Sequence, residues 1–441
     1  MRRNEVNALL RRYAQEHLSP TENERQFVTR VYTSVRDVLG EANCLQIGSY
    51  PRYTAITPLH DLDVLYVLGA WDPIAHDPSE ALRQLEARLR AEYVNPTDFE
   101  LQIARQTHSV TLRFLENGEE KFGVDIVPAY SSEMNEFGTD MYVVPEIAVR
   151  SHRERRQIVE QVSRGEKAMT WIKSDPRGYI AVASAINQAN EDFRKAVKIA
   201  KGWRSACKRA DPDFALKSFH LEQAITRSFV ANPDIDIFGA VFEFFRALPD
   251  LVRYPQIPDR ADPERNIDAY VADLSHADRT KIIRSRDAFL IKLEELSNSD
   301  AAMEDLLSAG ERHRASQTEA YLFDSGIPML TEVEFSITAT ALERAGSFRR
   351  MILDRIGRIG TDRKIEFRLG ADAPPADVYK WKVKNDDASP EPRGEITDHR
   401  THQDPENTKY NGTHYVECFA IRDGVCIGRS RQNVVLQWGQ G

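Results

Sequence analysis

The chain has 441 residues, with 68 acidic and 59 basic side chains and a formal net charge of -9. At about 150 residues per domain, this length accommodates two or three domains. Hydrophobic residues make up 41% and charged residues 29%, which is the balance of a globular protein and excludes a disordered one. The acidic character argues against a general nucleic-acid coat, although a local basic groove is compatible with it.

The cellular compartment follows from the start of the chain and from its cysteines. The first residues interleave charged and apolar side chains, unlike a signal peptide. No stretch approaches the roughly 18 apolar residues that a membrane span needs. The four cysteines are scattered without a CxxC pair: Cys44, Cys207, Cys418 and Cys426. We therefore expect a cytoplasmic protein without disulfides and without a membrane partner.

Helices and strands alternate up to about residue 150. Ser19-Pro20-Thr21-Glu22 predicts a capping box with proline at the first helical position, and Gly40 ends the helix that follows. The turn at residues 116–119 predicts a β-hairpin. The remaining predicted elements are a short strand at 44–47, a buried strand at 62–68, a helix at 79–93, and the hairpin strands at 109–115 and 122–127.

The rest of the chain changes from helical to β-rich. Two long helical segments are predicted at 185–209 and 278–300, followed by a break near 324–330 and one more helical piece to about Ile356. Further on, apolar residues alternate with lysines, and Asp423-Gly424 predicts a two-residue hairpin turn. The alternating residues predict a half-buried strand with Tyr379, Trp381 and Val383 on one face and Lys380, Lys382 and Lys384 on the other.

The informative segment runs from residue 48 to residue 68. Asp61 and Asp63 open an apolar run, so on a strand both carboxylates point to the same face. Asp125 alternates with apolar residues on a later strand and would supply a third carboxylate. Carboxylate oxygens suit Mg²⁺, and three of them can bridge two ions. The turn Gly48-Ser49 lies between a strand and an expected helix start, where backbone amides and a hydroxyl can hold phosphate oxygens.

Each of these signals alone is weak. An Asp-x-Asp pair is common on protein surfaces, and Gly-Ser is a common turn, so neither alone indicates a catalytic site. Their combination is more specific, because an unpaired aspartate inside an apolar strand is costly to bury, as at Asp125. A metal site explains the pattern better than packing does.

The pattern GS-x11-DLD followed by VDIVPAY resembles the polymerase-β-type nucleotidyltransferases. More narrowly, the sequence is similar to the bacterial cGAS/DncV-like nucleotidyltransferases, the SMODS-type synthetases of oligonucleotide second messengers. The further matching segments are WIKSDPRGY (171–179), AKGW (200–203), KSFHLEQAI (217–225) and PDRADPERNID (258–268). The resemblance implies an α+β fold: a polymerase-β-like mixed-sheet core at 1–170 and a helical subdomain at 171–325 that completes the nucleotide site.

The resemblance assigns roles to individual positions. Asp61, Asp63 and Asp125 would be catalytic and would ligate two Mg²⁺ ions, or Mn²⁺ in their place, with Asp125 next to the acceptor hydroxyl. Gly48 and Ser49 would hold the terminal phosphates. In the helical part, Lys201 and Ser218 would contact the triphosphate and Phe219 would stack on a base; taken alone, Lys201 reads more simply as a solvated helix lysine. One departure is Tyr53, which stands where the family usually has a glycine.

The tail carries a second resemblance, after a linker and helix expected at 326–360. The segments WKVKND (381–386), PRGEI (392–396), the stretch 402–421 and CIGRS (426–430) resemble the adenylyl/guanylyl-cyclase- and SMODS-associated C-terminal sensor domain. This implies a β-rich regulatory domain at 361–441. Within it a polar and aromatic cluster is a candidate ligand site, and its histidines and cysteine are zinc candidates that lack a CxxC or HxxxH pair. The residues concerned are Tyr410, Asn411, Gly412, His414, Glu417 and Cys418 for the cluster, and His399 and His402 as further zinc candidates.

The resemblance implies an enzyme that condenses nucleoside triphosphates into a cyclic or short linear oligonucleotide, releases pyrophosphate and serves anti-phage signalling. Its partners would be the triphosphates and a downstream effector that reads the product; no nucleic-acid activator is indicated. Two alternatives stay open: nucleotidyl transfer to a protein or RNA acceptor, and a catalytically silent nucleotide-binding sensor. There is no P-loop, His60-Asp61 lacks the further histidines of a phosphohydrolase, and the basic cluster at 150–156 suits either phosphate binding or a solvated helix face.

Overall fold

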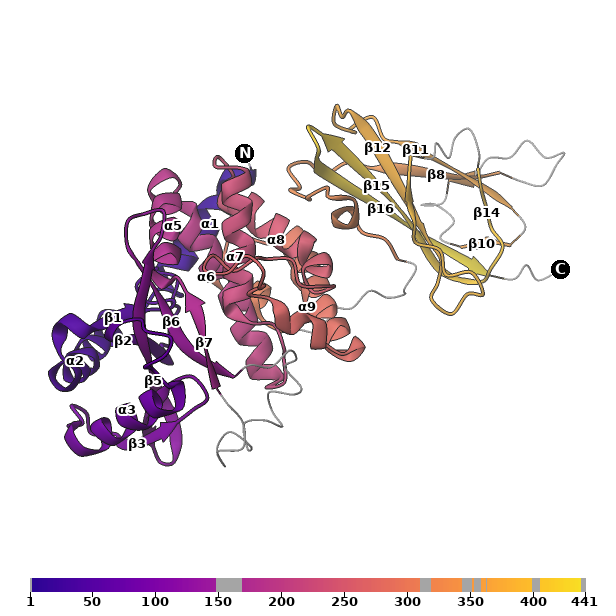
Figure 1. Cartoon of the computed structure of the whole chain (residues 1–441). Helices are drawn as coiled ribbons and strands as arrows, with labels where there is room; N and C mark the ends of the chain where they lie inside the picture. Colours follow the sequence, from indigo (N-terminus) through magenta and orange to yellow (C-terminus); the bar gives the residue numbers. More distant parts are fainter. Residues whose placement is uncertain are drawn as a thin grey trace. The chain divides into compact units, whose positions relative to one another are not determined.

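The structure is a computed structural model that describes residues 2–147, 169–309, 319–342, 351–352, 358–361, 363–398 and 405–437. The chain divides into two units (Figure 1). We call residues 7–283 and 307–309 the α/β unit, and residues 1–6, 284–306 and 310–441 the β-rich unit. The basic cluster at 150–156 lies outside the described residues.

The α/β unit is built on a mixed sheet. Its strand order is β1-β2-β5-β4-β3, with β6 paired to β5 and β7 paired to β6. Strands β2 and β5 run parallel, whereas the other pairs are antiparallel. The strands are β1 (Cys44–Ile47), β2 (Asp61–Ala70), β3 (Glu100–Arg105), β4 (Val110–Glu116), β5 (Glu119–Met134), β6 (Asp140–Ile147) and β7 (Met169–Ser174). The predicted hairpin is confirmed as β4–β5, with Asn117 and Gly118 both at positive φ.

Two helices, α2 (Glu22–Leu39) and α3 (Pro78–Glu92), cover one face of this sheet. Val28, Val31 and Val35 of α2 and Leu82 and Leu85 of α3 share one buried cluster with β2, β4 and β5. The predicted capping box exists two residues further on. Thr21 is the N-cap and pairs with Glu24, whereas the Ser19 hydroxyl donates to the Ala14 carbonyl.

The remaining elements before the β-rich segment are helical. The helices are α1 (Arg2–Glu16), α5 (Pro176–Ala189), α6 (Asp192–Ala210), α7 (Ser218–Ala231), α8 (Ile237–Leu251), α9 (His276–Glu294) and α10 (Asp300–Leu307), with 3-10 turns η1 (Glu41–Asn43), η2 (Ala269–Asp273) and η3 (Leu322–Ser325). None of these helices, in the described part of the chain, is long and apolar enough to cross a membrane.

The first long helical segment predicted from the sequence is two helices, α5 and α6, whereas the second is one helix, α9, which ends at Glu294. The first is interrupted at Asn190, whose side-chain amide donates to the carbonyl oxygens of Pro233 and Ile235 while its oxygen accepts from the backbone of Asp192. The next helix, α10, starts at Asp300, where the Ser299 hydroxyl accepts from the Ala302 amide as a cap. Polar side chains thus bond backbone groups at the starts of α6 and α10.

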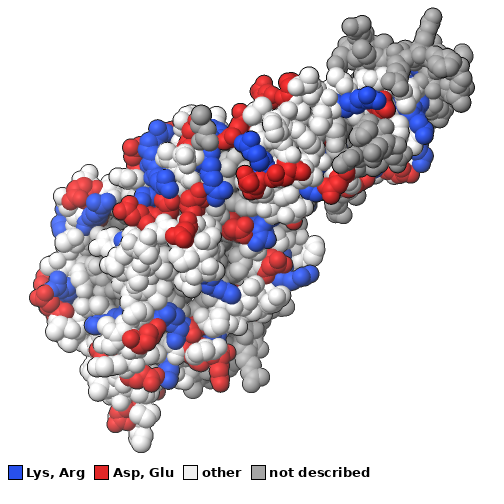
Figure 2. Space-filling view, turned by 90° about the horizontal axis from the view of Figure 1, so that it is seen from above, with Lys and Arg blue, Asp and Glu red and all other residues white. Residues whose placement is uncertain are grey.

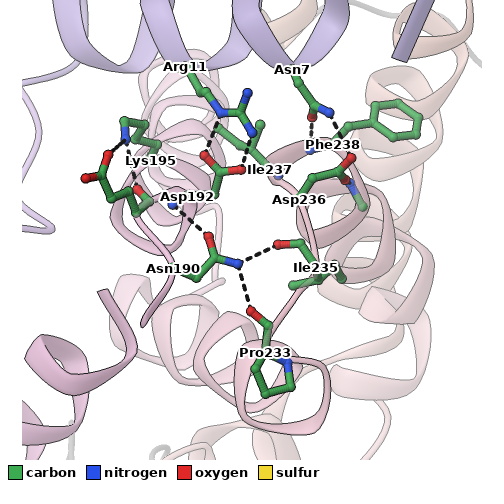
Figure 3. Close-up of polar contacts among 12 residues, drawn as sticks. Asn7, Arg11, Asn190, Asp192, Lys195, Pro233, Ile235, Asp236, Ile237 and Phe238 are labelled. Atoms are coloured by element: carbon green, nitrogen blue, oxygen red, sulfur yellow. Dashed lines mark hydrogen bonds and ion pairs between the residues drawn. The ribbon is translucent and has the colours of Figure 1, made fainter. Parts of the chain in front are cut away.

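The first helix is fixed to the helical part by a polar network (Figure 3). Arg11 donates two hydrogen bonds of 2.7 Å to Asp192 at the start of α6. Asn7 donates to Asp236 and accepts from the Phe238 amide at the start of α8. The Asp192 carboxylate also accepts from the Ile237 amide. Helix α1 therefore holds the N-termini of α6 and α8 together.

The β-rich unit contains two sheets with a shared core. One has the order β10-β16-β15-β12-β13 and the other β14-β11-β8-β9. The strands are β8 (Ile337–Leu342), β9 (Met351–Ile352), β10 (Ile359–Gly360), β11 (Lys364–Leu369), β12 (Val378–Lys384), β13 (Ile396–Thr397), β14 (Glu406–Asn407), β15 (Gly412–Arg422) and β16 (Val425–Gln437). Side chains of both sheets, such as Phe367 and Trp381, form the core. The hairpin at Asp423-Gly424 is confirmed.

Two sequence predictions fail in this unit. The segment 326–360, expected to be linker and helix, contains strand β8, which pairs with β11 along its whole length because Ile337, Ala339 and Ala341 alternate into the core. Strand β12 is buried on both faces rather than on one. Lys382 is only 3% exposed, because it donates to Glu319 at 2.7 Å, and Lys384 is equally buried. The fold class itself, α+β with a β-rich end, is confirmed.

Candidate active site

Three aspartates lie side by side on the parallel strands β2 and β5. Asp63 is the direct register partner of Asp125, and Asp61 is the partner of Gly123. Because side chains alternate along a strand, Asp61 and Asp63 share one face. Asp61 is exposed, while Asp63 and Asp125 are half-buried. The pairing predicted between the two acidic strands is therefore present, and it places three carboxylates at one position of the sheet.

The electrostatics of Asp63 reflect this crowding. Burial, together with the charges of Asp61 and Asp125, raises the pKa of Asp63 to about 7, against the opposing charges of Arg52 and Lys201. Asp125 is held in place by hydrogen bonds from the hydroxyls of Thr111 and Ser109. A cation bound between the three carboxylates would offset their mutual repulsion.

The chemical type of these three ligands suits magnesium. All three side chains offer the hard oxygens that Mg²⁺ or Mn²⁺ prefers. Among the described residues, no three His, Cys, Asp or Glu side chains form a closed ligand cluster. In such a site a substrate's phosphates would complete the coordination of the metal.

Gly48 lies directly against this site. It follows β1, whose last residue, Ile47, is the register partner of Asp63. Its backbone has φ +76, and a Cβ atom added there would stand 1.9 Å from the Asp63 Oδ2 atom. Any side chain at position 48 would displace the Asp63 carboxylate, so the position requires glycine. The structure therefore brings Gly48 and the acidic pair together, as the sequence predicts.

The loop after Gly48 differs from the expectation of a helix start. Residues 48–53 form turns, and the Thr54 amide donates to the Ser49 carbonyl at 3.1 Å. Tyr53 stands at φ 59, so this position keeps the left-handed backbone that a glycine would adopt freely. Arg194 of α6 lies over the Tyr53 ring, 4.6 Å from its centroid, and donates to the Arg52 carbonyl.

The Lys201 ammonium group belongs to a buried network of hydrogen bonds. Its Nζ atom contacts Glu222 at 2.7 Å and the Thr54 carbonyl at 3.1 Å. Glu222 also accepts from Arg52 and from the Thr54 hydroxyl. Burial opposes the charged form of Glu222, but Lys201 and Arg52 outweigh it and lower the pKa of Glu222 to about 2. The network joins the loop 48–54 to α6 and α7.

The other helical candidates lie around this network. Phe219, in the first turn of α7, packs edge-on against Tyr179 and lies under the Arg52 guanidinium, 5.3 Å from it. Ser218 is the first residue of α7. Lys198 donates to the Ser19 hydroxyl at 2.8 Å, and burial lowers the pKa of Lys198 to about 8. The phosphate and base contacts of Lys201, Ser218 and Phe219 stay predictions.

Sequence reasoning missed Arg52, Thr54 and Glu222. Their positions fall inside the motif segments 48–68 and 217–225, but nothing local marks them as partners. Glu222 lies 170 positions from Arg52 and 168 from Thr54. The one available signal is a glutamate within an otherwise apolar helix face, since such a residue is rarely buried without a cationic partner.

The polar cluster of the β-rich unit does not form a zinc site by itself. Cys418 is fully buried in the core, whereas the His414 ring bonds the Asp386 amide and the Tyr410 carbonyl. His399 and His402 lie outside the described residues. Both nitrogens of His414 are thus engaged with backbone groups, so this imidazole is placed to fix a loop.

Comparison with protein-family models identifies the tail. Residues 313–437 match the Adenylyl/Guanylyl and SMODS C-terminal sensor domain. This confirms the resemblance seen in the tail sequence and extends the domain towards the N-terminus, so that it includes β8. Comparison with the curated proteins gives no match.

Several solved structures are similar to the chain at low identity. The E. coli MS115-1 CdnC:HORMA-deltaN complex has 18% identity over 70% of this chain and 98% of that one, with a TM-score of 0.47. Vibrio cholerae DncV cyclic AMP-GMP synthase has 14% identity over 68% and 93%, with a TM-score of 0.43. Rhodothermus marinus CdnE c-UMP-AMP synthase has 13% identity over 65% and 96%, with a TM-score of 0.40. At these values the likeness transfers no activity to this chain.

Proposed function

We propose that this protein is a metal-dependent nucleotidyltransferase that condenses nucleoside triphosphates into a cyclic or short linear oligonucleotide second messenger. The observation that carries the proposal is the register of Asp63 with Asp125, with Asp61 beside them and Gly48 packed against Asp63. The motif resemblance and the sensor-domain match of the tail support the same class.

The reaction would join two nucleotides through a phosphodiester bond. A ribose hydroxyl of one nucleotide attacks the α-phosphorus of another, the bond to the bridging oxygen breaks, and pyrophosphate leaves. The hydroxyl proton must be accepted as the new bond forms, and Asp125 is the carboxylate we place next to that hydroxyl. A second round on the same nucleotides would close a ring or extend the chain.

Each residue of the site would have its own role in this reaction. Asp61, Asp63 and Asp125 would hold two Mg²⁺ or Mn²⁺ ions, which when bound offset the charge of the triphosphate and of the leaving pyrophosphate. Gly48 and Ser49 would hold the terminal phosphates with backbone amides and a hydroxyl. Lys201 and Ser218 would lie next to the phosphates, and Phe219 would stack on a base. Glu222 would hold the loop 48–54 in position through Arg52 and Thr54.

The biological setting remains part of the proposal. We place the protein in the cytoplasm, in anti-phage signalling, with a separate effector that reads the product and with a tail that regulates synthesis. On the face drawn in Figure 2, basic and acidic side chains are interspersed, so the described residues of that face form no continuous basic surface. This is consistent with small nucleotides as partners and gives no support to a nucleic-acid activator.

Product analysis tests the proposal against its alternatives. The purified protein is incubated with all ribonucleoside and deoxyribonucleoside triphosphates and Mg²⁺ or Mn²⁺, and the products are resolved by mass. A cyclic or short linear oligonucleotide together with pyrophosphate supports the proposal. Nucleotides found only on an added RNA or on the protein would indicate the transferase alternative. Binding without any product under these conditions would indicate a silent sensor.

A further inference from the structure

The β-rich unit contains a cavity of about 210 Å³ between its two sheets. Strands β12, β15 and β16 of one sheet and β11 and β14 of the other contribute to its walls. The floor is apolar and belongs to the shared core. It is formed by Ile365, Phe367, Val383, Val416, Val434 and Leu436. Binding is favoured when an apolar surface of a ligand covers an apolar floor of this kind and removes it from water.

The volume limits the size of the group that enters. An apolar protein cavity of about 150 Å³ accommodates benzene. A cavity of 210 Å³ therefore has room for a somewhat larger flat ring system, of the size of a nucleobase. A sugar or any larger substituent would have to stay at the mouth.

The charges at the rim are already paired with one another. Arg393 contacts Glu406 at 2.8 Å, and Lys409 contacts Glu391 at 3.0 Å. The four charged side chains that line the cavity thus cancel in sign. A phosphate would be attracted only weakly by cations that are already paired with carboxylates, and those carboxylates would repel it. The rim therefore favours an uncharged ligand.

The remaining polar groups can recognise the edge of a heteroaromatic ring. Asn407 lines the cavity and is exposed, so its amide can offer one donor and one acceptor at the mouth. Such an amide edge can pair with the edge of a base. His414 bonds the backbone of Asp386 and of Tyr410, and Tyr410 also lines the cavity. Burial lowers the pKa of His414, in keeping with a neutral ring.

We infer that this cavity is a binding site for an uncharged nucleobase or nucleoside, distinct from the triphosphate site of the α/β unit. The apolar floor would bury the base, Asn407 would bind its polar edge, and the paired rim would disfavour phosphorylated forms. The inference does not depend on the proposed catalytic activity, because the site shares no residue with the aspartate cluster.

Binding to the full chain, without divalent metal, tests the inference. Adenosine, guanosine, cytidine and uridine are titrated by calorimetry in the presence of EDTA, each beside its 5′-monophosphate. We expect saturable binding of at least one nucleoside, with its monophosphate no tighter. Asn407→Trp, which fills the mouth from an exposed position, should weaken that binding about tenfold or more.

Two control variants distinguish binding in this cavity from a nonspecific effect of tryptophan and from binding at the aspartate cluster. Asn433→Trp makes the same change on β16 next to Val434, at an exposed position on the other face of the strand, and should leave affinity within about twofold. Asp61→Asn with Asp63→Asn should also leave nucleoside affinity unchanged. The inference is overturned if no nucleoside binds at millimolar concentration, if monophosphates bind markedly tighter, if the two tryptophan variants behave alike, or if the aspartate variants abolish binding.

Discussion

Position 48 accepts only glycine for two independent reasons, and they can be separated by experiment. The backbone there has φ +76, which costs alanine about 1–2 kcal/mol. In addition, a Cβ atom would collide with the Asp63 carboxylate. Gly118 has a similar φ of +80 in the β4–β5 turn, but nothing lies within 4 Å of its Cβ position. The two glycines therefore differ only in the neighbour that a side chain would meet.

We predict that Gly48→Ala abolishes most nucleotidyl transfer, whereas Gly118→Ala leaves it unchanged. Both variants should lose about 1 kcal/mol of stability from the backbone. Only Gly48→Ala displaces a carboxylate of the site, for which we expect a loss of about a hundredfold in turnover. Thermal unfolding and product formation are measured on both variants. Equal activity in the two would show that the contact with Asp63 is not functional.

The aspartates themselves give the second prediction. Asp61→Asn with Asp63→Asn keeps the volume of both side chains and removes charge that would offset bound metal. We expect product formation to fall by about a thousandfold or more. The metal-free fold should not lose stability at neutral pH, because Asp63 carries a pKa raised by its burial and by its acidic neighbours. Asp37→Asn, on the exposed side of α2, is the matched control. Normal turnover in the double variant would refute the site.

At the scale of elements, Glu222 joins α7 to α6 and to the loop 48–54. Glu222→Gln would leave Lys201 and Arg52 as two buried cations without their carboxylate. We expect a loss of about 3–5 kcal/mol in the free energy of unfolding. Glu243→Gln on α8 breaks an exposed pair with Arg246 and should cost about 1 kcal/mol or less. Urea unfolding of the two variants gives the comparison, and similar losses would mean that the buried network is not stabilising.

The same network explains why the buried ion pair of Lys201 could not be predicted from its helix alone. The sequence places Lys201 on an amphipathic helix but does not reveal Glu222 on the next helix, since that contact depends on how α6 and α7 pack. The aspartates were predictable because strand alternation fixes their common face locally. Strand β8 was not predicted although Ile337, Ala339 and Ala341 alternate as on a strand, because its alanines and leucine also suit a helix; pairing with β11 decides in favour of the strand.

A second buried carboxylate lies at the end of α9, within the β-rich unit. Glu294 has a buried oxygen that accepts no hydrogen bond from the described residues. Burial, together with the charges of Glu417 and Glu295, raises the pKa of Glu294 to about 8, against the opposing charges of Arg429 and Lys382. Between pH 4.5 and pH 8 the folded state therefore holds a proton that the unfolded state releases. The contribution of Glu294 to stability must fall as pH rises through this window.

We predict that Glu294→Gln becomes progressively more stabilising, relative to the natural chain, as pH rises from 4.5 to 8. The difference in unfolding free energy between Glu294→Gln and the natural chain should increase by at most about 1.4 kcal/mol per pH unit. Denaturant unfolding at several pH values measures the difference between the two proteins. Glu295→Gln, at the exposed neighbouring position, should show no such trend. A difference for Glu294→Gln that is the same at every pH would contradict the assignment.

At the scale of the whole molecule, every catalytic candidate belongs to the α/β unit. The candidates lie between Gly48 and Glu222, and the sheet, α2 and α3 form a core of their own. The sensor-domain match begins at residue 313, before β8. Strand β8 has its pairing partner β11 in the β-rich unit, so a cut placed after β8 divides a sheet, whereas a cut before residue 313 does not.

We therefore predict different outcomes for two shortened chains. A chain ending at Ala309 should fold cooperatively and bind nucleoside triphosphate with Mg²⁺, because the α/β unit keeps its sheet and all candidate residues. A chain ending at Ile356 retains β8 but loses β11, and should expose Ile337, Ala339 and Ala341 and aggregate. Light scattering, thermal unfolding and nucleotide titration compare the two. If the chain ending at Ala309 is folded but binds no triphosphate, the β-rich unit helps to build the active site and cannot be a purely regulatory module. If instead it binds and its rate no longer responds to a nucleoside that affects the full chain, regulation resides in the β-rich unit.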